Sequence, residues 1–381
     1  MIYFDNAATT YPKPVSVTNT VARAMKQYGA NPGRGGHEMS IRTAEEIFRA
    51  RKSAADFFHA KGEECVAFTL NCTHATNIVL KGLLNPGDHV VTSCLEHNAI
   101  MRPLNDLSQK GIAFTAVDVY PGDNDATLDA FRKGINQNTR LIACMHASNV
   151  WGIRLPIERI AALAKEYQIP FLVDAAQSAG VLPIDMQDMG IDFLCLAGHK
   201  GLYGPMGTGM LITDKGENLR TIIEGGTGTN SLSMEQPDSM PDKFESGTPN
   251  VPGIIGLAAG IEYIKKTKIE TIAKHEYQLV QRLYDKLSRI KDVELYMKRP
   301  DPNYFAPLLS FNLRGKDSET TAEFLSKRGI AVRAGLHCAP SAHRFCGTLD
   351  RGAVRVCPSM FSKSSEIDYF VSVVQKIAIK N

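Results

Sequence analysis

A lysine stands in this chain where it can act as a nucleophile. Lys200 lies in the sequence Gly198-His199-Lys200-Gly201, directly after an apolar run, 193–197, that has the composition of a buried strand. Burial removes water from an ammonium group, which lowers its pKa and frees the amine to form a Schiff base. A solvated loop lysine is the commoner outcome at such a position, so the interpretation depends on partners elsewhere in the chain.

Asp174 is the first such partner. It ends another apolar run, 171–173, and is followed by Ala175-Ala176-Gln177. A carboxylate at the carboxyl end of a strand can keep the pyridine nitrogen of pyridoxal phosphate (PLP) protonated, which makes the ring an electron sink. Considered alone, Asp174 is more simply explained as a turn or helix-capping residue.

Two further segments supply what a phosphorylated ring would need. Asn71-Cys72-Thr73-His74 lies between a strand, 66–70, and a helix that we expect to begin near Ala75, and helix N-termini bind phosphate. Plain N-capping by Thr73 is the alternative. His97 follows a strand at 89–93 and can stack on an aromatic ring, although strand-end histidines more often have only a local hydrogen-bonding role.

Cys338 differs from the other seven cysteines, most of which lie in apolar runs typical of small buried hydrophobes. Its neighbours include Arg333 and His337. The chain has no C-x-x-C pair and no short secreted context, so we expect no disulfides. A zinc site formed by His337, Cys338, His343 and Cys346 is a competing hypothesis, but the spacing lacks the paired ligands that structural zinc prefers. We therefore expect no metal.

Composition limits the remaining possibilities. The chain has 381 residues, a net charge of +3, 44% hydrophobic and 22% charged residues, which is ordinary for a soluble globular protein. This balance implies neither nucleic acid nor an anionic membrane as a partner. Apolar runs such as 141–147 are far shorter than the ~20 residues that span a bilayer. We expect a cytoplasmic protein with two domains, because single cores stop growing at roughly 250 to 300 residues.

Apolar runs and helical segments alternate through the first part of the chain. This alternation predicts an α/β domain with a seven-stranded, mostly parallel sheet. A long amphipathic helix should precede the sheet, with Thr43 and Glu46 as a capping box. Its apolar face should carry Ile47, Ala50, Ala54, Phe57 and Phe58. The expected strands are 66–70, 89–93, 114–119, 141–147, 171–175, 193–198 and 209–213.

The pattern changes after Pro252. Helices are expected at 254–265 and 274–290, a final helix should begin near Ser364 or Ser365, and a long loop covers 225–242. We predict a large domain over residues 15–252, and a smaller α+β domain formed by residues 1–14 and 253–381. The strands expected in the smaller domain are 293–297, 308–313, 331–334 and 353–356.

Taken together and in order, these segments resemble the class V aminotransferase family of fold-type I PLP enzymes. Within that family the chain is similar to the cysteine desulfurase and selenocysteine lyase group. The resemblance extends over nearly the whole chain, and its specificity comes from the joint occurrence of the motifs. The matching segments are YFDNAATT (3–10), RGGH (Arg34 to His37), EHNA (96–99), SNVWG (148–152), VDAAQ (173–177), GHK (198–200), FESGTPN (244–250), RAGLHCAP (333–340) and Arg355.

The resemblance implies a role for each ring-binding residue. Lys200 would hold PLP covalently and move protons at the substrate, while Asp174 would pair with the pyridine nitrogen. Gln177 would contact the phenolic oxygen, Asn149 would contact the ring side and the substrate, and His97 would stack on the ring and relay protons.

The phosphate and the substrate have their own implied residues. Cys72, Thr73 and His199 would surround the phosphate, and Thr248 would reach the cofactor of a neighbouring subunit, which implies a homodimer. Arg355 would bind the substrate carboxylate, as suits a planar bidentate donor, and the motifs that contain Ala8 and His37 would contribute to the substrate site.

The implied reaction converts L-cysteine to alanine. Cys338 would take the sulfur as a persulfide and pass it to an acceptor protein, with Arg333 and His337 favouring the thiolate. The short segment around Cys338 is similar to that of group II desulfurases, so we expect the acceptor to come to the site. Iron–sulfur cluster or thio-cofactor assembly is the expected destination of the sulfur.

Other functions stay open at this point. They are a selenocysteine lyase, another class V reaction such as transamination or epimerisation, and an inactive sulfur-carrier or scaffold protein. The chain departs from the family pattern at two places. Ala197 lies where the family has a serine near the phosphate, and Cys357 lies two residues after Arg355, where the family usually has an Ala-Ser pattern. The roles of Cys346 and Cys357 are not defined by the sequence.

Overall fold

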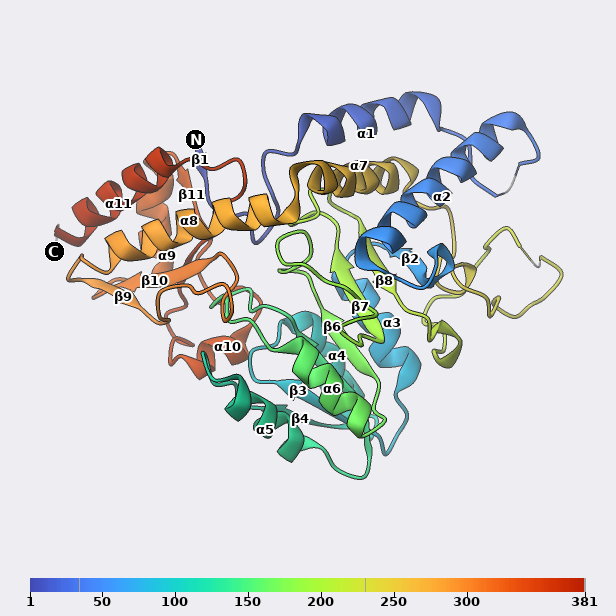
Figure 1. Cartoon of the computed structure of the whole chain (residues 1–381), viewed down its shortest axis with the longest axis horizontal. Helices are drawn as coiled ribbons and strands as arrows, with labels where there is room; N and C mark the ends of the chain where they lie inside the picture. Colours follow the sequence, from blue (N-terminus) through green and yellow to red (C-terminus); the bar gives the residue numbers. More distant parts are fainter. Residues whose placement is uncertain (34, 230, 380–381) are drawn as a thin grey trace.

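The computed structural model describes residues 1–33, 35–229 and 231–379, so Arg34 of the RGGH motif lies outside the described residues. Its central feature is a seven-stranded sheet in the order β2-β8-β7-β6-β5-β3-β4 (Figure 1). All seven predicted strands are present within a few residues of their expected positions. They are β2 (Val66–Thr69), β3 (His89–Ser93), β4 (Ala113–Val117), β5 (Thr139–Met145), β6 (Phe171–Asp174), β7 (Phe193–Ala197) and β8 (Gly209–Ile212).

The sheet is mostly parallel, as predicted. Strands β7, β6, β5, β3 and β4 run in one direction, and β8 is antiparallel to both β2 and β7. In the register of the central strands, Asp174 is opposite both Met145 and Cys195. The carboxyl ends of β5, β6 and β7 therefore lie side by side, which is where parallel α/β sheets place their ligands.

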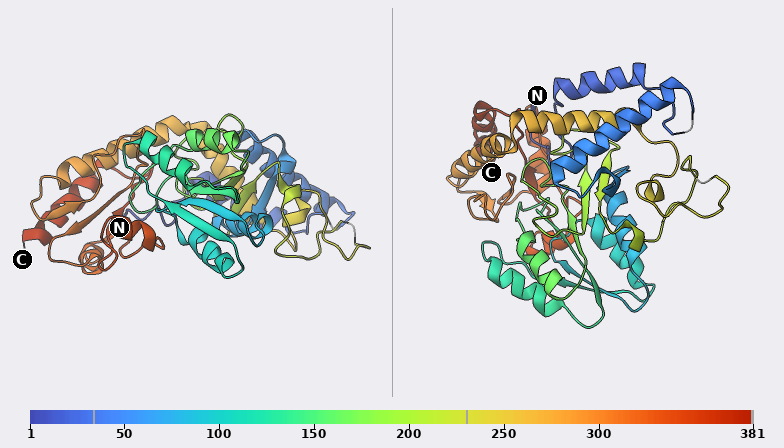
Figure 2. Two further views of the ribbon diagram at one scale, coloured as in Figure 1. Left: turned by 90° about the horizontal axis from the view of Figure 1, so that it is seen from below. Right: turned by 45° about the vertical axis from the view of Figure 1, so that its right-hand side comes forward.

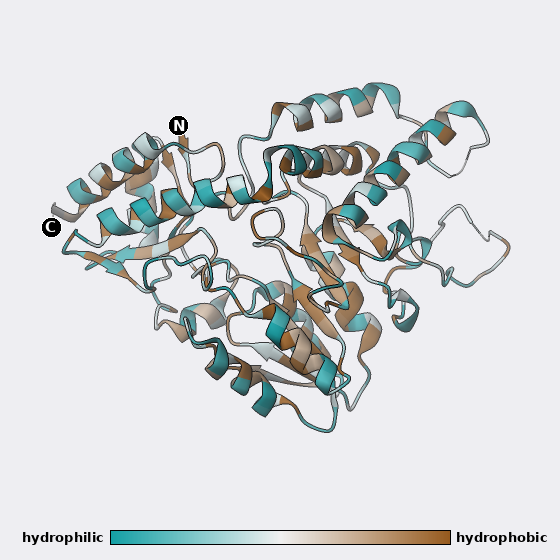
Figure 3. Cartoon of the chain, in the orientation of Figure 1, coloured by the Kyte–Doolittle hydropathy of each residue, from teal (hydrophilic) through white to brown (hydrophobic). Residues whose placement is uncertain are grey.

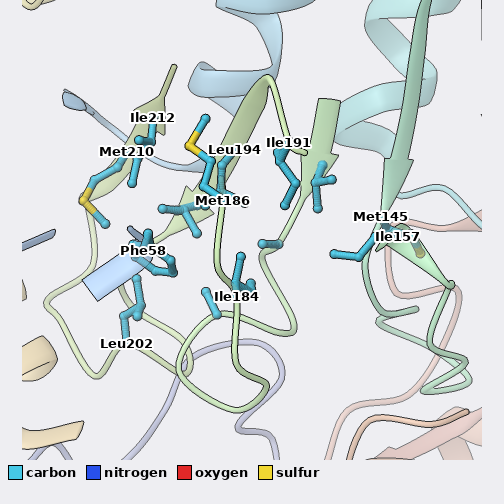
Figure 4. Packing of buried hydrophobic residues seen from close by; sticks show 14 of the residues in the cluster. Phe58, Met145, Ile157, Ile184, Met186, Ile191, Leu194, Leu202, Met210 and Ile212 are labelled. Atoms are coloured by element: carbon cyan, nitrogen blue, oxygen red, sulfur yellow. The ribbon is translucent and has the colours of Figure 1, made fainter. Parts of the chain in front are cut away.

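Helices cover both faces of the sheet, and successive strand residues face opposite cores. Leu194 and Leu196 belong to one apolar cluster, whereas Phe193 and Cys195 belong to the other. Figure 4 shows the first cluster, in which Leu194 lies near Met186. The helices of this part are α1 (Val15–Gln27), α2 (Glu38–Phe58), α3 (Cys72–Leu83), α4 (Asn98–Ser108), α5 (Asn124–Gly134), α6 (Ile157–Glu166) and α7 (Val251–Thr267).

The capping box predicted for α2 is wrong. The helix begins earlier, because the Nδ1 atom of His37 accepts the backbone N–H of Ser40 at 3.3 Å and so caps the first turn. Thr43 is buried inside the helix, and its hydroxyl donates to the Met39 carbonyl at 2.9 Å. The predicted apolar face is correct, with Ile47, Ala50, Ala54 and Phe58 buried.

The C-terminal elements form a second α+β unit at one side of the sheet (Figure 2). Its antiparallel sheet has the order β12-β10-β9, and β1 (Ile2–Tyr3) pairs in parallel with β11 (Ile330–Ala331). A third apolar cluster, containing Phe4, Phe311 and Phe370, forms its core. The other elements are α8 (Ile269–Leu287), β9 (Val293–Leu295), β10 (Leu309–Leu313), α9 (Ser318–Ser326), α10 (Pro340–Phe345), β12 (Val354–Val356) and α11 (Ser364–Ile379).

The domain boundary at residue 252 stays a prediction. Helix α7, which spans that boundary, packs against α1 and α2, and α8 packs against α11. The predicted loop is correct for its described residues between 225 and 241, which contain neither helix nor strand, and Leu232 and Met234 in it are exposed. In Figure 3 the central strands are hydrophobic and the outer faces of the helices are polar. Within the described ranges, no helix is long and apolar enough to cross a membrane.

Candidate active site

A cavity of about 300 Å³ lies at the carboxyl ends of the central strands. It gathers every residue predicted to bind the cofactor except Thr248. Thr248 is exposed elsewhere and accepts a hydrogen bond from Asn31 Nδ2 at 3.4 Å. The predicted residues that line the cavity are Cys72, Thr73, His97, Asn149, Asp174, Gln177, His199 and Lys200, together with Ala197.

Asp174 is held in a fixed orientation at the end of β6. Its Oδ1 atom accepts the backbone N–H of Ala176 at 2.9 Å and the thiol of Cys72 at 3.3 Å. Burial raises the pKa of Cys72 well above its usual value, and the charge of Asp174 raises it further. Cys72 is therefore a neutral donor to Asp174, and its predicted place beside the phosphate stays a prediction.

Lys200 lies in a tight turn where backbone segments approach closely. A Cβ atom on Gly201 would lie 2.4 Å from the Ala179 carbonyl oxygen, so the turn requires glycine there. Desolvation lowers the pKa of Lys200, an effect that the charge of Asp174 partly opposes. A larger share of neutral amine results, which is the form that attacks carbonyl carbon.

The N-terminal segment is tied to this turn. The His199 carbonyl accepts the N–H of Thr10 at 3.1 Å and Lys13 Nζ at 2.6 Å, and the Lys200 carbonyl accepts the hydroxyl of Thr10 at 2.8 Å. On the cavity side, Gln177 Nε2 donates to the Ala7 carbonyl at 2.9 Å. The first ten residues therefore form part of the frame around Lys200.

His97 is a neutral residue with a defined tautomer. Its Nδ1 atom accepts the N–H of Ala99 at 3.0 Å and caps α4, so the ring proton lies on Nε2. Burial lowers the pKa of His97 to about 4, and the charges of Lys200, Arg333 and Arg355 add to this effect.

Arg355 connects the second unit to the cavity wall. Its side chain is 1% exposed, Nη2 pairs with Asp5 Oδ1 at 2.9 Å, and Nη1 donates to the Asn149 carbonyl at 2.8 Å. Nε is buried and lacks a partner among the residues described. A substrate carboxylate would satisfy this donor, because buried N–H groups are almost always paired.

Replacing Arg355 with lysine should raise the KM for an amino-acid substrate by about tenfold to 100-fold, because a planar charged donor contributes about 1.5–3 kcal/mol to such a bond. Steady-state kinetics with the wild type measured in parallel would check this. Arg314→Lys, on the solvent-exposed end of the C-terminal sheet, is the matched control and should leave KM unchanged. An unchanged KM in Arg355→Lys would exclude the carboxylate contact.

Cys338 is the exposed member of the eight cysteines, all of which are described. Its Sγ atom lies 3.7 Å from Arg333 Nη2, which confirms the predicted proximity of Arg333. The charge predicted for His337 is wrong, because burial lowers the pKa of His337 to about 2 and the ring is neutral. The positive charge beside the Cys338 thiol is therefore that of Arg333, not of His337.

The Cys338 loop lies against the cavity wall. Asn149 Nδ2 donates to the His337 carbonyl at 2.7 Å, and the Asn98 N–H donates to the Cys338 carbonyl at 2.8 Å. Asn149 also lines the cavity, so one residue contacts both the cavity and the Cys338 loop. This link lies between segments far apart in the chain and had no signal in the sequence.

The remaining predicted residues are less directly placed. His37 is exposed and caps α2, and Ala8 is half-buried near the N-terminal frame. Burial raises the pKa of both Cys346 and Cys357 to about 12, so both are neutral thiols. The zinc hypothesis gains no support within the described ranges, which contain no group of three or more suitable ligands.

Sequence reasoning missed several buried titratable groups. Burial raises the pKa of Glu96 to about 8, and it accepts hydrogen bonds from Ser93 Oγ at 2.5 Å and Met145 N–H at 3.0 Å. Glu276 on α8 also has a pKa raised to about 8 by burial. Seven histidines have lowered pKa values, led by desolvation in each case: His74, His89, His97, His146, His199, His337 and His343.

These groups give opposite contributions to stability between pH 4.5 and 6.5. The lowered histidines bind protons in the unfolded chain but not in the folded one, so their contribution to stability is lost as the pH falls through 6.5. Glu96 and Glu276 have the opposite effect, because their raised pKa values make the folded protein more stable as the pH falls. Seven histidines oppose these two glutamates, so the histidine contribution is larger. We therefore expect the free energy of unfolding of the cofactor-free protein to decrease from pH 6.5 to pH 4.5, as urea titration at each pH would show.

A variant isolates the glutamate contribution. Glu276 gives stability below pH 4.5 that is lost as the pH rises toward 8, because the unfolded carboxyl ionises first. Relative to the wild type, Glu276→Gln should therefore become steadily more stable from pH 4.5 to pH 8, by up to about 1.4 kcal/mol per pH unit. A stability difference that does not change with pH would show that Glu276 ionises normally.

The fold and the cavity define an α/β enzyme of fold type I with its site at the carboxyl edge of a parallel sheet. The sequence model of the class-V aminotransferases matches residues 2–370, and the chain belongs to this family. A probable cysteine desulfurase from Methanothermobacter thermautotrophicus is 34% identical to it, with 99% of this chain and 94% of the relative covered.

Solved structures give the same result. The apo structure of a cysteine desulfurase from Thermococcus onnurineus NA1 has a TM-score of 0.93 and 32% identity, covering 100% of this chain and 95% of the other. The cysteine desulfurase CsdA from Escherichia coli has a TM-score of 0.88 and 28% identity, covering 99% of this chain and 94% of the other. The predicted family, group and fold are confirmed.

Proposed function

We propose that this protein is a PLP-dependent L-cysteine desulfurase. One observation carries the proposal: an exposed thiol, Cys338, stands beside Arg333 on a loop that Asn149 joins to the cavity of Lys200 and Asp174. A nucleophilic sulfur next to an amine site suits sulfur transfer from an amino acid. The family and its cysteine desulfurase relatives support this assignment.

The cavity fits pyridoxal phosphate. Asn149 Oδ1 and His199 Nδ1 line it and are buried without a hydrogen-bond partner in the described part of the chain, so a polar ligand is expected there. The N-terminus of α3 also opens onto the cavity and suits a phosphate group. The residues that would hold the cofactor are Lys200, Asp174, Gln177, Asn149, His97, Thr73, His199 and Cys72.

When bound, the cofactor supplies an electron sink for the bonds at the substrate α-carbon. Lys200, whose pKa is lowered by burial, takes and returns protons there as a general base and acid. Arg355 holds the substrate carboxylate through its unpaired Nε. The negative charge of Asp174 supports a protonated ring nitrogen.

Cys338 performs the sulfur transfer. Its thiolate attacks the substrate sulfur, so that a new S–S bond forms while the C–S bond breaks. The electron pair of the broken bond goes to the substrate β-carbon, which takes up a proton, and alanine leaves. Arg333 stabilises the thiolate before the attack.

The proposal includes partners. A sulfur-acceptor protein, expected in iron–sulfur cluster or thio-cofactor assembly, would meet the exposed Cys338. Thr248, which is exposed and outside its own cavity, supports a homodimer in which it reaches the neighbouring subunit's cofactor. A cytoplasmic location stays a prediction.

The test combines product analysis with mass spectrometry. The protein with PLP is exposed briefly to cysteine, and we expect one added sulfur atom on Cys338 and one alanine for each sulfur released. Transamination or epimerisation would give no alanine from cysteine and would exclude the proposal. Selenocysteine offered in parallel gives the substrate preference ratio, and a strong preference for it would assign a lyase.

A further inference from the structure

We propose that His337 is a positioning residue that fixes the Cys338 thiol against Arg333 through a buried chain of two imidazoles. This inference rests on the proposed function, because it concerns how the nucleophile of that reaction is held. The predicted charge of His337 is excluded by its burial, so the residue needs another explanation. His337 and His343 are 3% and 0% exposed, and neither contacts the proposed cofactor cavity directly.

The Cys338 loop adopts an unusual backbone conformation. His337 and Cys338 have φ values of 51° and 56°, and both are residues with a Cβ atom in the left-handed region. Such conformations are uncommon outside glycine, asparagine, aspartate and histidine, so the one at Cys338 persists only where the surroundings hold it. Two consecutive examples at the nucleophile indicate that the loop is constrained by its contacts.

Two hydrogen bonds from the part of the chain that forms the seven-stranded sheet hold the backbone of this loop, and a third holds α10, which follows the loop. Asn149 Nδ2 donates to the His337 carbonyl at 2.7 Å, and Trp151 Nε1 donates to the Ala342 carbonyl at 2.7 Å. The Asn98 N–H donates to the carbonyl of Cys338 itself at 2.8 Å. These bonds fix the carbonyl groups, but they do not fix the thiol relative to Arg333.

The imidazole chain supplies that second constraint. His337 Nε2 lies 3.3 Å from the Arg333 carbonyl, and His337 Nδ1 lies 3.3 Å from His343 Nε2. His343 Nδ1 lies 2.8 Å from the hydroxyl of Thr348. The two rings are nearly parallel, with an interplanar angle of 9°.

The proton positions in this chain follow from the last acceptor. A carbonyl only accepts, so His337 Nε2 carries the ring proton and donates a hydrogen bond to the Arg333 carbonyl. His337 Nδ1 must then accept from His343 Nε2, and His343 Nδ1 accepts from the hydroxyl of Thr348. Every bond points the same way, and both rings are neutral.

The chain of hydrogen bonds ends at Arg333, the residue whose side chain contacts the Cys338 thiol. The Arg333 backbone is held by His337, and its guanidinium lies 3.7 Å from Cys338 Sγ. His337 is also the residue directly before Cys338. It therefore links both ends of the Arg333–Cys338 contact.

Three substitutions separate the two tasks of His337. His337→Gln keeps a donor that can reach the Arg333 carbonyl, His337→Asn keeps only the tolerance of positive φ, and His337→Val loses both. His59→Val is the matched control, because His59 also has a φ of 51° but is exposed at the end of α2. It reports the stability cost of valine in this conformation away from the site.

The first readout needs no turnover. Alkylation of Cys338 by iodoacetamide, followed by peptide mass spectrometry over a range of pH, reports how well Arg333 stabilises the thiolate. We expect the alkylation profile of His337→Val to move to higher pH, that of His337→Asn to move less, and those of His337→Gln and His59→Val to match the wild type.

The second readout is the rate of persulfide formation from cysteine. His337→Val should lower kcat by about 100-fold with KM nearly unchanged, since a displacement of about 1 Å costs that much. Wild-type alkylation and kcat in His337→Val, or an equal loss in His59→Val, would overturn the inference. A wild type that forms no persulfide would instead reject the proposed function. The two failures can be distinguished, because the alkylation profiles need no turnover and would still report on the position of the thiol.

Discussion

Cys338→Ala should release sulfide from cysteine at least about 10³-fold more slowly than the wild type, because no other group can accept the sulfur. The remaining thiols near the site are poor substitutes. Burial raises the pKa of Cys72 well above its usual value and that of Cys346 and Cys357 to about 12, so none of the three provides thiolate near neutral pH. Sulfide and alanine assays, with persulfide detected by peptide mass spectrometry, would measure the loss.

Two controls make this result specific. Cys346→Ala and Cys357→Ala should each form the persulfide on Cys338 at close to the wild-type rate. Added sulfur found on Cys346 or Cys357 in otherwise unmodified protein would contradict the assignment of the nucleophile. Visible absorption of added PLP should be the same in all three variants, because none of these thiols lines the cavity at the carboxyl ends of the central strands.

Lys200→Ala should lose alanine formation by about 10³-fold or more, since general acid–base catalysis alone contributes about 10²–10⁴-fold. Under the proposed function, the variant loses both the attachment point for the cofactor and the proton-carrying amine. Borohydride reduction of the wild type with PLP, followed by digestion and mass spectrometry, should locate the cofactor on the Lys200 peptide.

Lys13 is the stringent control for this experiment. Burial lowers its pKa to about 8, and its Nζ atom lies 2.6 Å from the His199 carbonyl. Lys13 is therefore a second partly neutral amine close to the site. Lys13→Ala should retain the borohydride label on Lys200, and a label found on Lys13 in the wild type would reassign the cofactor.

The sequence was sufficient for elements whose signal is local. Strands β6 and β7 are built on continuous apolar runs, and runs of this kind are buried on both faces of a parallel sheet. Asp174 and Lys200 could be assigned to strand ends because their strands were so clear. The short helices α9 and α10 were missed, because six to nine residues carry too little periodicity to distinguish them from loops.

Properties that depend on burial could not be predicted. Proximity to Cys338 suggested a charged His337, whereas desolvation in the folded protein makes this ring neutral. The capping box at Thr43 had the right residue types, but the His37 ring, a less common cap, begins the helix first. The bond from Asn149 to the His337 carbonyl joins residues 188 positions apart, a contact that only the tertiary fold creates.

The double left-handed turn at His337 and Cys338, clamped from the sheet domain, makes the thiol a stationary delivery point. A mobile loop could carry the sulfur to an acceptor protein. A fixed loop instead requires the acceptor protein to diffuse to the thiol. The overall flux of sulfur should then depend on how often recipients arrive, and should rise in proportion to their concentration until docking is saturated.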